Sequence, residues 1–391
     1  MKLTVPTNWQ DDLVEKISRP GVDAVYGKLD SDFVGGGRPS CIFLKINKKK
    51  VKGHIQSIHD KGLKFYYLLN SSCLGNREWT KAGQREIRKL LNWLEEINVD
   101  GVVVGIPYLG ELIKKQCPRF EICVSSFAQV NSVNRAKFWE DLGASVITLS
   151  QVELTRDFKL LKIIRENVKC DLQLIVNGNC LQDCPLFFYH NNIVSHASQT
   201  SVKSELFTIN YCSFVCRYKM LSNPANFIRA TWIRPEDIQV YEEIGINKFK
   251  LIDRSMTSDA LARIVEAYSS RSYRGNLYDL FSGPSKTMWL NKPNFFHRFK
   301  YFFHPFAINI FKLIKERKLL KDIEVYIDNK KLDGFIKHFF NESCRYKSCD
   351  NCRYCYDIAD KVIKIDSVSR EALVVAYNGF LKRIISGEIF K

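Results

Sequence analysis

Two tight groups of cysteines are the residues of this chain whose spacing most clearly predicts chemistry. The first group is Cys180, Cys184, Cys212 and Cys216, and the second is Cys344, Cys349, Cys352 and Cys355. Thiolate ligands must converge on one centre, and paired cysteines on tight turns readily supply four of them. We therefore predict that all eight cysteines are metal ligands, in two separate sites.

The spacing favours iron–sulfur clusters. The run CxxCxxC from Cys349 to Cys355 places three thiolates around one centre, as in ferredoxin-type sites, whereas structural zinc more often uses two separated CxxC pairs. We expect one [4Fe–4S] cluster at the first group and a second at the C-terminal group. Zinc at the C-terminal group is the alternative, and cysteines that bind no metal in a reducing compartment are another for either group.

Composition narrows the class of protein and its partners. The chain has 391 residues, of which 46% are hydrophobic and 26% charged, the profile of a folded protein. Its formal net charge of +17 favours anionic partners such as RNA, lipid headgroups or a small dianion, unless the lysines simply solvate helix faces. No apolar run approaches the roughly 18 residues of a transmembrane segment, and the N-terminus turns acidic before a signal-peptide core could form. We expect a cytoplasmic protein.

The elements that position these residues alternate between apolar runs and amphipathic stretches. Strands are predicted at 2–6, 24–28, 63–69, 101–106, 121–126, 145–150, 172–177 and 248–253, and helices at 85–97, 134–143, 155–167 and 235–245. Continuous apolar strands separated by helices indicate a parallel sheet. Eight such units predict an α/β fold, a parallel (β/α)8 TIM-like barrel over residues 1–275. An open doubly wound sheet is the alternative, although the glycines at 35–37 do not follow a strand as that fold requires.

Two segments interrupt the barrel pattern. About 70 residues separate the seventh strand from the eighth, far more than a usual loop, and this connection holds the first cysteine group. We expect an Fe–S-binding insertion at about 178–230. Residues 276–391 are predicted to form a smaller C-terminal α+β, cysteine-rich appendage. Within it, 292–306 interleaves phenylalanines with basic residues, and we expect it to pack on the barrel rather than to bind RNA or a membrane.

Four polar residues lie at or just past predicted strand ends, where barrels of this class carry function. Arg254 could clamp a carboxylate, and Gln129 and Asn131 could orient a substrate by hydrogen bonds. Alternatively, Asn131 caps a helix and Arg254 pairs with Asp253. Asn177 is the fourth of these residues.

The catalytic residues cannot be named from spacing, and the candidates are Arg254, Asn177 and His190. His190 lies in the long connection near the first cysteine group and could be an acid or base, or simply a surface histidine. Neither the G-x-S-x-G motif nor the H-E-x-x-H motif occurs, which disfavours a hydrolase.

Three stretches carry a resemblance to a known family. The run SSFAQVNSVNRAKFWEDLGASVITLSQVEL (125–154), the turn LIVNGNC (174–180) and the segment TWIRPEDIQVYEEIGINKFKLIDR (231–254) resemble peptidase family U32, the collagenase-like peptidases. The similarity covers most of residues 1–255. The NGNC turn corresponds to the family's HGxxC element, and Arg254 matches an arginine that the family also places after a barrel strand.

The resemblance implies a redox activity rather than proteolysis. The family's better-understood members are bacterial tRNA and ribosomal RNA hydroxylation proteins and a pair of proteins for oxygen-independent ubiquinone hydroxylation. These carry a cysteine-ligated [4Fe–4S] cluster, and prephenate is implicated as the hydroxyl source. By resemblance, the chain is an oxygen-independent hydroxylase or related enzyme acting on RNA, a biosynthetic small molecule or a peptide, with a prephenate-like anion and a second family member as partners.

The chain also departs from the family pattern. Asn177 stands where the family has histidine, Gln151 replaces the arginine of its LSRE element, and the C-terminal cysteine group is absent from the familiar RNA-modifying members. A non-catalytic Fe–S partner subunit of a heteromeric hydroxylase is therefore the first alternative function. A protease, suggested only by the family's label, is the second.

Overall fold

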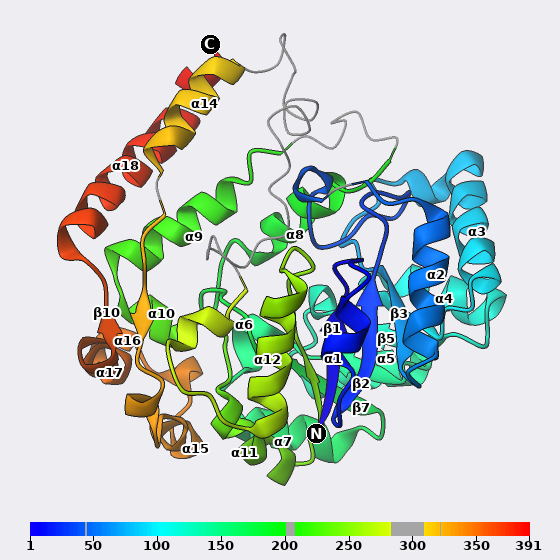
Figure 1. Cartoon of the computed structure of the whole chain (residues 1–391), viewed down its shortest axis with the longest axis horizontal. Coiled ribbons are helices and arrows are strands. Elements are labelled where there is room, and N and C mark those ends of the chain that lie inside the picture. The colour runs from blue at the N-terminus through cyan, green and yellow to red at the C-terminus, as the bar shows by residue number, and fades with distance from the viewer. Residues whose placement is uncertain (44, 201–207, 283–308, 321) are drawn as a thin grey trace.

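A closed barrel of eight parallel strands forms the body of the protein (Figure 1). The computed structural model describes all residues except 44, 201–207, 283–308 and 321. The strands are β1 (Lys2–Pro6), β2 (Val22–Gly27), β3 (Lys64–Leu69), β4 (Gly101–Val104), β5 (Glu121–Val124), β6 (Val146–Thr148), β7 (Asp171–Ile175) and β8 (Lys248–Lys250). They pair in sequence order, and β8 closes on β1 through Leu3 and Phe249. The prediction of a TIM-like barrel is confirmed, and the open sheet is excluded.

Both faces of the barrel strands are buried, which explains their continuous apolar sequences. One face packs with the surrounding helices in the main core. The alternate positions form a separate interior cluster that includes Tyr26, Leu68 and Cys123. Because side chains alternate along a strand, Lys250 lies on this interior face, next to the outward Phe249 of the main core.

Helices cover the strands. They are α2 (Lys48–His59), α3 (Lys81–Glu96), α4 (Pro107–Gln116), α5 (Val133–Leu142), α7 (Phe158–Asn167), α11 (Ile238–Glu243) and α12 (Ser258–Ser270). Of these, α3, α5, α7 and α11 lie close to the four that were predicted, whereas α2, α4 and α12 were not predicted. The predicted helix at 155–167 starts late, because the Asp157 carboxylate caps α7 by accepting the Leu160 N–H. Residues 151–154 form the separate short helix α6 (Gln151–Leu154).

The long connection between β7 and β8 is helical. It contains α8 (Phe187–His196), α9 (Tyr211–Ser222) and α10 (Ala225–Arg229). The C-terminal region adds α14 (Ile310–Leu319), β9 (Tyr326–Ile327), α15 (His338–Asn341), α16 (Cys349–Cys352), α17 (Tyr354–Val362), β10 (Ile363–Lys364) and α18 (Ser367–Ile385). Strands β9 and β10 pair antiparallel. The region is thus α+β and cysteine-rich, as predicted.

The C-terminal region packs on the β7–β8 connection. Helix α18 lies along α9 and beside α14, and α17 packs against α10 (Figure 1). The main hydrophobic core runs without interruption from the barrel to Tyr377 in α18. The predicted packing of 292–306 falls outside the described residues. No helix in the described ranges has the length and apolarity needed to cross a membrane.

Arg234 anchors this region to the barrel. Its guanidinium is buried and donates to Asn329 Oδ1 at 2.9 Å, to the Leu332 carbonyl at 2.6 Å and to the Asp333 carboxylate at 2.7 Å. A planar group with several donors in fixed directions suits such a junction. It satisfies groups that would otherwise be buried without partners.

Replacing Arg234 by Met should lower the free energy of unfolding by about 2–4 kcal/mol, because Asn329 and the Leu332 carbonyl lose their buried donor. Urea unfolding followed by circular dichroism measures the change. The matched control is Arg271→Met, because Arg271 is half-exposed and pairs with Glu242 at 2.8 Å. The control should cost less than about 1 kcal/mol. Equal losses in both variants would contradict the anchoring role of Arg234.

Candidate functional site

A cationic cavity lies at the C-terminal ends of the barrel strands. We call it the mouth cavity. Its volume is about 100 Å³, and its charged and amide lining residues are Arg38, Asn70, Gln151, Lys250, Asp253 and Arg254. Three cations therefore face one carboxylate. The excess of positive charge makes this the natural place for an anion.

Arg254 lies where the sequence predicted it, at the barrel mouth. Its side chain is buried, donates to the Lys28 carbonyl at 3.1 Å and stacks over Phe43 at 4.5 Å. Burial lowers the pKa of Arg254 to about 10. Arg254 also borders a second cavity of about 190 Å³, lined by Lys28, Lys45 and other residues. The guanidinium therefore stands between two cavities.

Asp253 does not neutralise its neighbour Arg254 by direct pairing. One oxygen of its carboxylate accepts hydrogen bonds from the Ser255 main chain and hydroxyl, and the other lies 3.7 Å from Arg38. The backbone of Asp253 is left-handed at φ +93°, a conformation that costs energy in a residue other than glycine. This strain lies next to the cavity, as is common at functional sites.

Arg38 is a site residue that sequence reasoning missed. It follows three glycines, which we had considered only as a dinucleotide-binding signal. A Cβ atom on Gly35 would meet Gln199 Cγ at 2.5 Å, and one on Gly36 would meet Asn70 Oδ1 at 2.8 Å. The glycines let this loop pass closely over the barrel and carry Arg38 to the mouth.

His190 is half-buried in α8. Burial, with a smaller contribution from the Arg38 charge, lowers its pKa to about 4. The imidazole is therefore neutral at pH 7 and could accept a proton or a hydrogen bond. The structure thus brings His190 near the same arginine that approaches Asp253, but its catalytic use stays a prediction.

Asn177 is held by the strand next to it. Its side-chain nitrogen donates to the Ile252 carbonyl at 3.0 Å, and its side-chain oxygen accepts from the Ile252 N–H at 2.8 Å. The residue is completely buried. Both hydrogen-bonding groups of the side chain join the ends of β7 and β8. Asn177 therefore has a structural contact in this structure rather than a free group that faces the cavity.

Gln129 and Asn131 also bond within the protein and do not line the mouth cavity. Gln129 donates to the Ser126 carbonyl at 2.6 Å, and Asn131 donates to the Glu153 carboxylate at 2.7 Å. The structure does not show Asn131 as the helix cap that we considered, because the cap of α5 is Ser132. A substrate contact by either residue remains untested.

Lys250 and Gln151 complete the mouth cavity. The Lys250 ammonium group lies over the Tyr26 ring at 4.2 Å, and burial lowers the Lys250 pKa to about 8. Gln151 donates toward the Cys180 sulfur at 3.5 Å. The sequence signal for Lys250 is a lysine inside a predicted barrel strand, KFKLID at 248–253, where charged side chains are uncommon.

Cys180 of the first cysteine group lies beside this cavity, and the charge of Cys184 acts on the other three thiols of the group. The Cys180 turn is tied to Thr231, whose N–H donates to the Cys180 carbonyl at 3.1 Å. Cys212 and Cys216 lie one turn apart on α9, so they share a helix face. Burial raises the pKa of Cys180 and Cys212 to about 11 and that of Cys216 to about 12, and the nearby charge of Cys184 contributes to all three.

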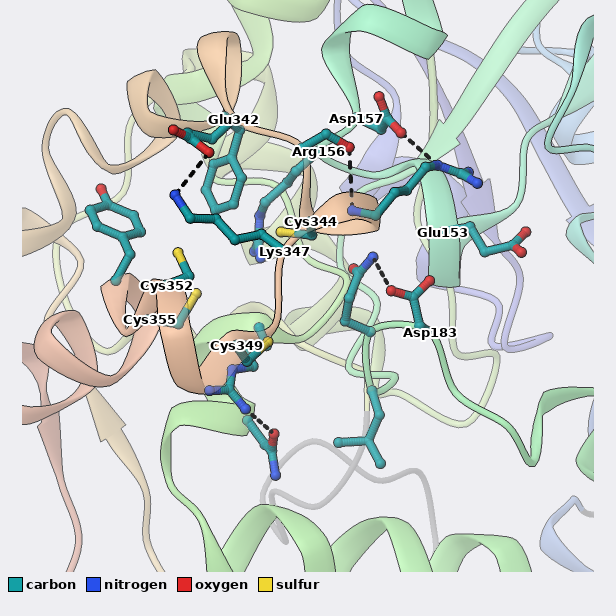
Figure 2. A pocket seen from close by; sticks show the side chains of 18 of the residues that line it. Glu153, Arg156, Asp157, Asp183, Glu342, Cys344, Lys347, Cys349, Cys352 and Cys355 are labelled. Carbon is teal, nitrogen blue, oxygen red and sulfur yellow. Dashed lines mark hydrogen bonds and ion pairs between the residues drawn. The ribbon is translucent and has the colours of Figure 1, made fainter.

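The second cysteine group borders a larger cavity of about 350 Å³ (Figure 2). Burial, and next the charge of Cys355, raises the Cys344 pKa to about 11. The Cys352 sulfur lies 3.7 Å from Nε2 of His338. In Figure 2, Cys352 and Cys355 lie together, while Cys344 and Cys349 approach from other sides of the cavity.

The two cysteine groups are neighbours in space. Leu181, Asp183 and Pro185 belong to the segment around Cys184, and they line the cavity of the second group. Lys219 lines it too, and its charge acts on the Cys184 thiol. The two groups therefore occupy one side of the molecule, between the barrel mouth and the C-terminal region.

Each group supplies the soft thiolate donors that iron–sulfur clusters and zinc prefer. Within the part of the chain that the structure describes, however, no three His, Cys, Asp or Glu side chains are already arranged closely enough to hold a metal ion. The thiols share a neighbourhood without forming a closed coordination shell. Metal binding would have to draw them together and release their protons. Both metal sites stay predictions.

Comparison with known proteins identifies the family. The model of peptidase family U32 matches residues 12–274, more than half of the chain. An "uncharacterized protease" of Methanocaldococcus jannaschii is 28% identical over 334 residues, which cover 85% of this chain and 87% of that protein.

Two solved structures are also similar. A structure described as a U32 peptidase is 22% identical with a TM-score of 0.46, over 64% of this chain and 92% of that one. A chitinase of Rhizomucor miehei is 9% identical with a TM-score of 0.37, over 69% of this chain and all of that one. The length of the family match, together with the barrel, leads to one conclusion. The chain belongs to peptidase family U32.

Proposed function

We propose that this protein is an iron–sulfur enzyme that performs an oxygen-independent hydroxylation or a related redox modification. The observation that carries the proposal is the position of the first cysteine group at the barrel mouth, directly beside a cavity rich in cations. Gln151 links the cysteine group to the cavity, because it lines the cavity and donates toward the Cys180 sulfur. A redox centre and an anion site would thus be in contact.

The proposed cluster ligands are Cys180, Cys184, Cys212 and Cys216. A bound [4Fe–4S] cluster would supply one-electron chemistry. The chain's own contribution is to bury the thiols and to place the Gln151 amide where it can donate to a ligating sulfur, an interaction that tunes such centres. The substrate would be RNA, a small biosynthetic molecule or a peptide.

The anion that this site takes is proposed to be prephenate-like. The Arg254 guanidinium can bind a carboxylate through two parallel N–H donors, and Arg38 supplies a second positive charge. Burial excludes competing water and strengthens such contacts.

A non-catalytic partner subunit is the second candidate. Four thiolates saturate a [4Fe–4S] cluster, and the family arginine is replaced by Gln151, so the chain could deliver electrons to a second family member. A protease is the third candidate, and it rests on the name of the family and of the Methanocaldococcus relative. A heteromer would be recognised by co-purification, and a protease by peptide hydrolysis that persists without iron.

Protein purified without oxygen should be brown and should contain iron and acid-labile sulfide in similar amounts. Single Ala variants of the four cysteines of the first group should each lose one cluster, because a [4Fe–4S] cluster that lacks one thiolate ligand binds weakly. Iron and sulfide analysis with visible absorbance measures this. Cys73→Ala, which lies outside both groups, is the control and should keep full iron content. Stoichiometric zinc without sulfide would refute the cluster proposal.

The C-terminal group should behave as an independent site. Cys349→Ala or Cys352→Ala should remove the second metal while the spectrum of the first cluster persists, because the two groups use separate ligands. Metal analysis of each variant, with electron paramagnetic resonance of the reduced protein, separates the two sites. Loss of zinc alone would favour the zinc alternative. Simultaneous loss of both centres would contradict two independent sites.

Arg254→Lys should weaken prephenate binding by about 1–3 kcal/mol, because lysine keeps the charge but loses the planar pair of donors. Isothermal titration of the anaerobic protein measures the affinity, and the cluster spectrum should not change. Arg263→Lys on the exposed side of α12 is the control and should bind normally. Unchanged affinity in the Arg254 variant would place the anion elsewhere.

A further inference from the structure

Lys250 is a buried amine that no carboxylate pairs with in the described part of the chain, and the titratable group that acts on it is the buried thiol of Cys123. It ends strand β8, and its side chain lies on the interior face of the barrel with only 7% of its surface exposed. Its nitrogen lies over the face of Tyr26. Among the described residues, no carboxylate pairs with it, although the buried Lys28 nearby pairs with Asp32 at 3.0 Å. The charge of Lys28 is therefore neutralised by Asp32, whereas Lys250 lines the cavity without a carboxylate partner among the described residues.

An unpaired ammonium in the interior is costly, so a lysine in this position is driven toward its neutral form. Burial lowers the Lys250 pKa to about 8. A neutral amine has a free electron pair and attacks carbonyl carbons, which is why desolvated lysines close to other cations serve as nucleophiles. Arg38 and Arg254 line the same cavity, so the amine and two carboxylate-binding groups face one ligand.

Two buried oxygens in the cavity also lack partners. Asn70 Oδ1 and Gln151 Oε1 have no hydrogen-bond donor among the described residues, and the two residues are only 9% and 6% exposed. Buried amide oxygens are normally paired. Their state indicates that donors from outside the protein, such as ordered water beside a bound ligand, complete the cavity, independently of the charge argument.

We propose that Lys250 forms an imine with the carbonyl carbon of a small 2-oxo acid whose carboxylate is held by Arg254 and Arg38. A cavity of about 100 Å³ admits only a few heavy atoms, either a small ligand or the 2-oxo acid arm of a larger one such as prephenate. The groups that match the arginines and the amine must therefore be adjacent in the ligand. A 2-oxo acid has a carboxylate directly bonded to a carbonyl. The inference rests on the anion site proposed above, since prephenate also contains a 2-oxo acid group.

The step balances without an oxidant or reductant. The Lys250 nitrogen forms a bond to the carbonyl carbon, and the carbonyl oxygen takes up the protons that the nitrogen gives up. The oxygen then leaves as one molecule of water, and a carbon–nitrogen double bond remains. Asp253 is the one carboxylate among the described residues that line the cavity, so we assign it the exchange of these protons.

Reductive trapping tests the proposal. The full-length protein, purified without oxygen, is incubated with pyruvate and sodium cyanoborohydride, which converts an imine into a stable secondary amine. Intact mass and peptide mapping should show one adduct per chain, at Lys250. Lys250→Arg should show none, and Arg254→Lys should need about tenfold more pyruvate because the carboxylate contact weakens. Lys248→Arg is the control, because Lys248 lies two residues away and pairs with Asp23 at 2.9 Å.

The possible outcomes separate this inference from the anion site. Pyruvate that binds in equilibrium dialysis and forms no adduct would overturn the imine and leave the anion site standing. If pyruvate neither binds nor forms an adduct, both the imine and the anion site are refuted. Labelling of Lys28 or of surface lysines in place of Lys250 would also refute the imine. If Lys250→Arg fails to fold, Lys250→Met replaces it, because an apolar chain of similar length suits the interior position.

Discussion

The functional end of this barrel depends on the two hydrogen bonds between the Asn177 side chain and the Ile252 main chain. They join β7 and β8 just beyond the last residues that pair as strands. The chain that leaves one side of this link reaches Cys180 three residues later, and the chain that leaves the other side reaches Arg254 after two. This buried amide therefore helps to set the distance between the proposed cluster and the proposed anion site, together with the main-chain pairing of β7 and β8.

The sequence was sufficient to predict the barrel, because apolar runs buried on both faces and amphipathic helices leave few other arrangements. It also indicated Arg254, since strand ends meet at one rim. The sequence could not distinguish side chains that face the cavity from side chains that hydrogen-bond within the surrounding protein. Asn177, Gln129 and Asn131 all follow strands, yet each is held by neighbours on its own rim. That difference depends on local hydrogen bonds, which spacing does not encode.

The residues that sequence reasoning missed reach the mouth through contacts between distant segments. Arg38 arrives on a loop whose glycines press against Asn70 and Gln199. What makes Lys250 a cavity residue is the face of the strand on which it lies. A shift of the strand register by one residue would have placed its side chain outside the barrel. Gln151 had been noted as a departure from the family, but its contact with Cys180 requires the folded chain.

Charge balance explains why these residues belong together. Asp32 is fully occupied by Lys28, by the Tyr67 hydroxyl and by the Gly35 N–H. Among the described residues that line the mouth cavity, Asp253 is the one carboxylate that offsets Arg38, Arg254 and Lys250. A folded protein retains such an imbalance at a cost in stability, and a bound anion removes that cost, so affinity and stability are linked at this site. The same excess of cations that weakens the empty barrel would favour the proposed anionic ligand.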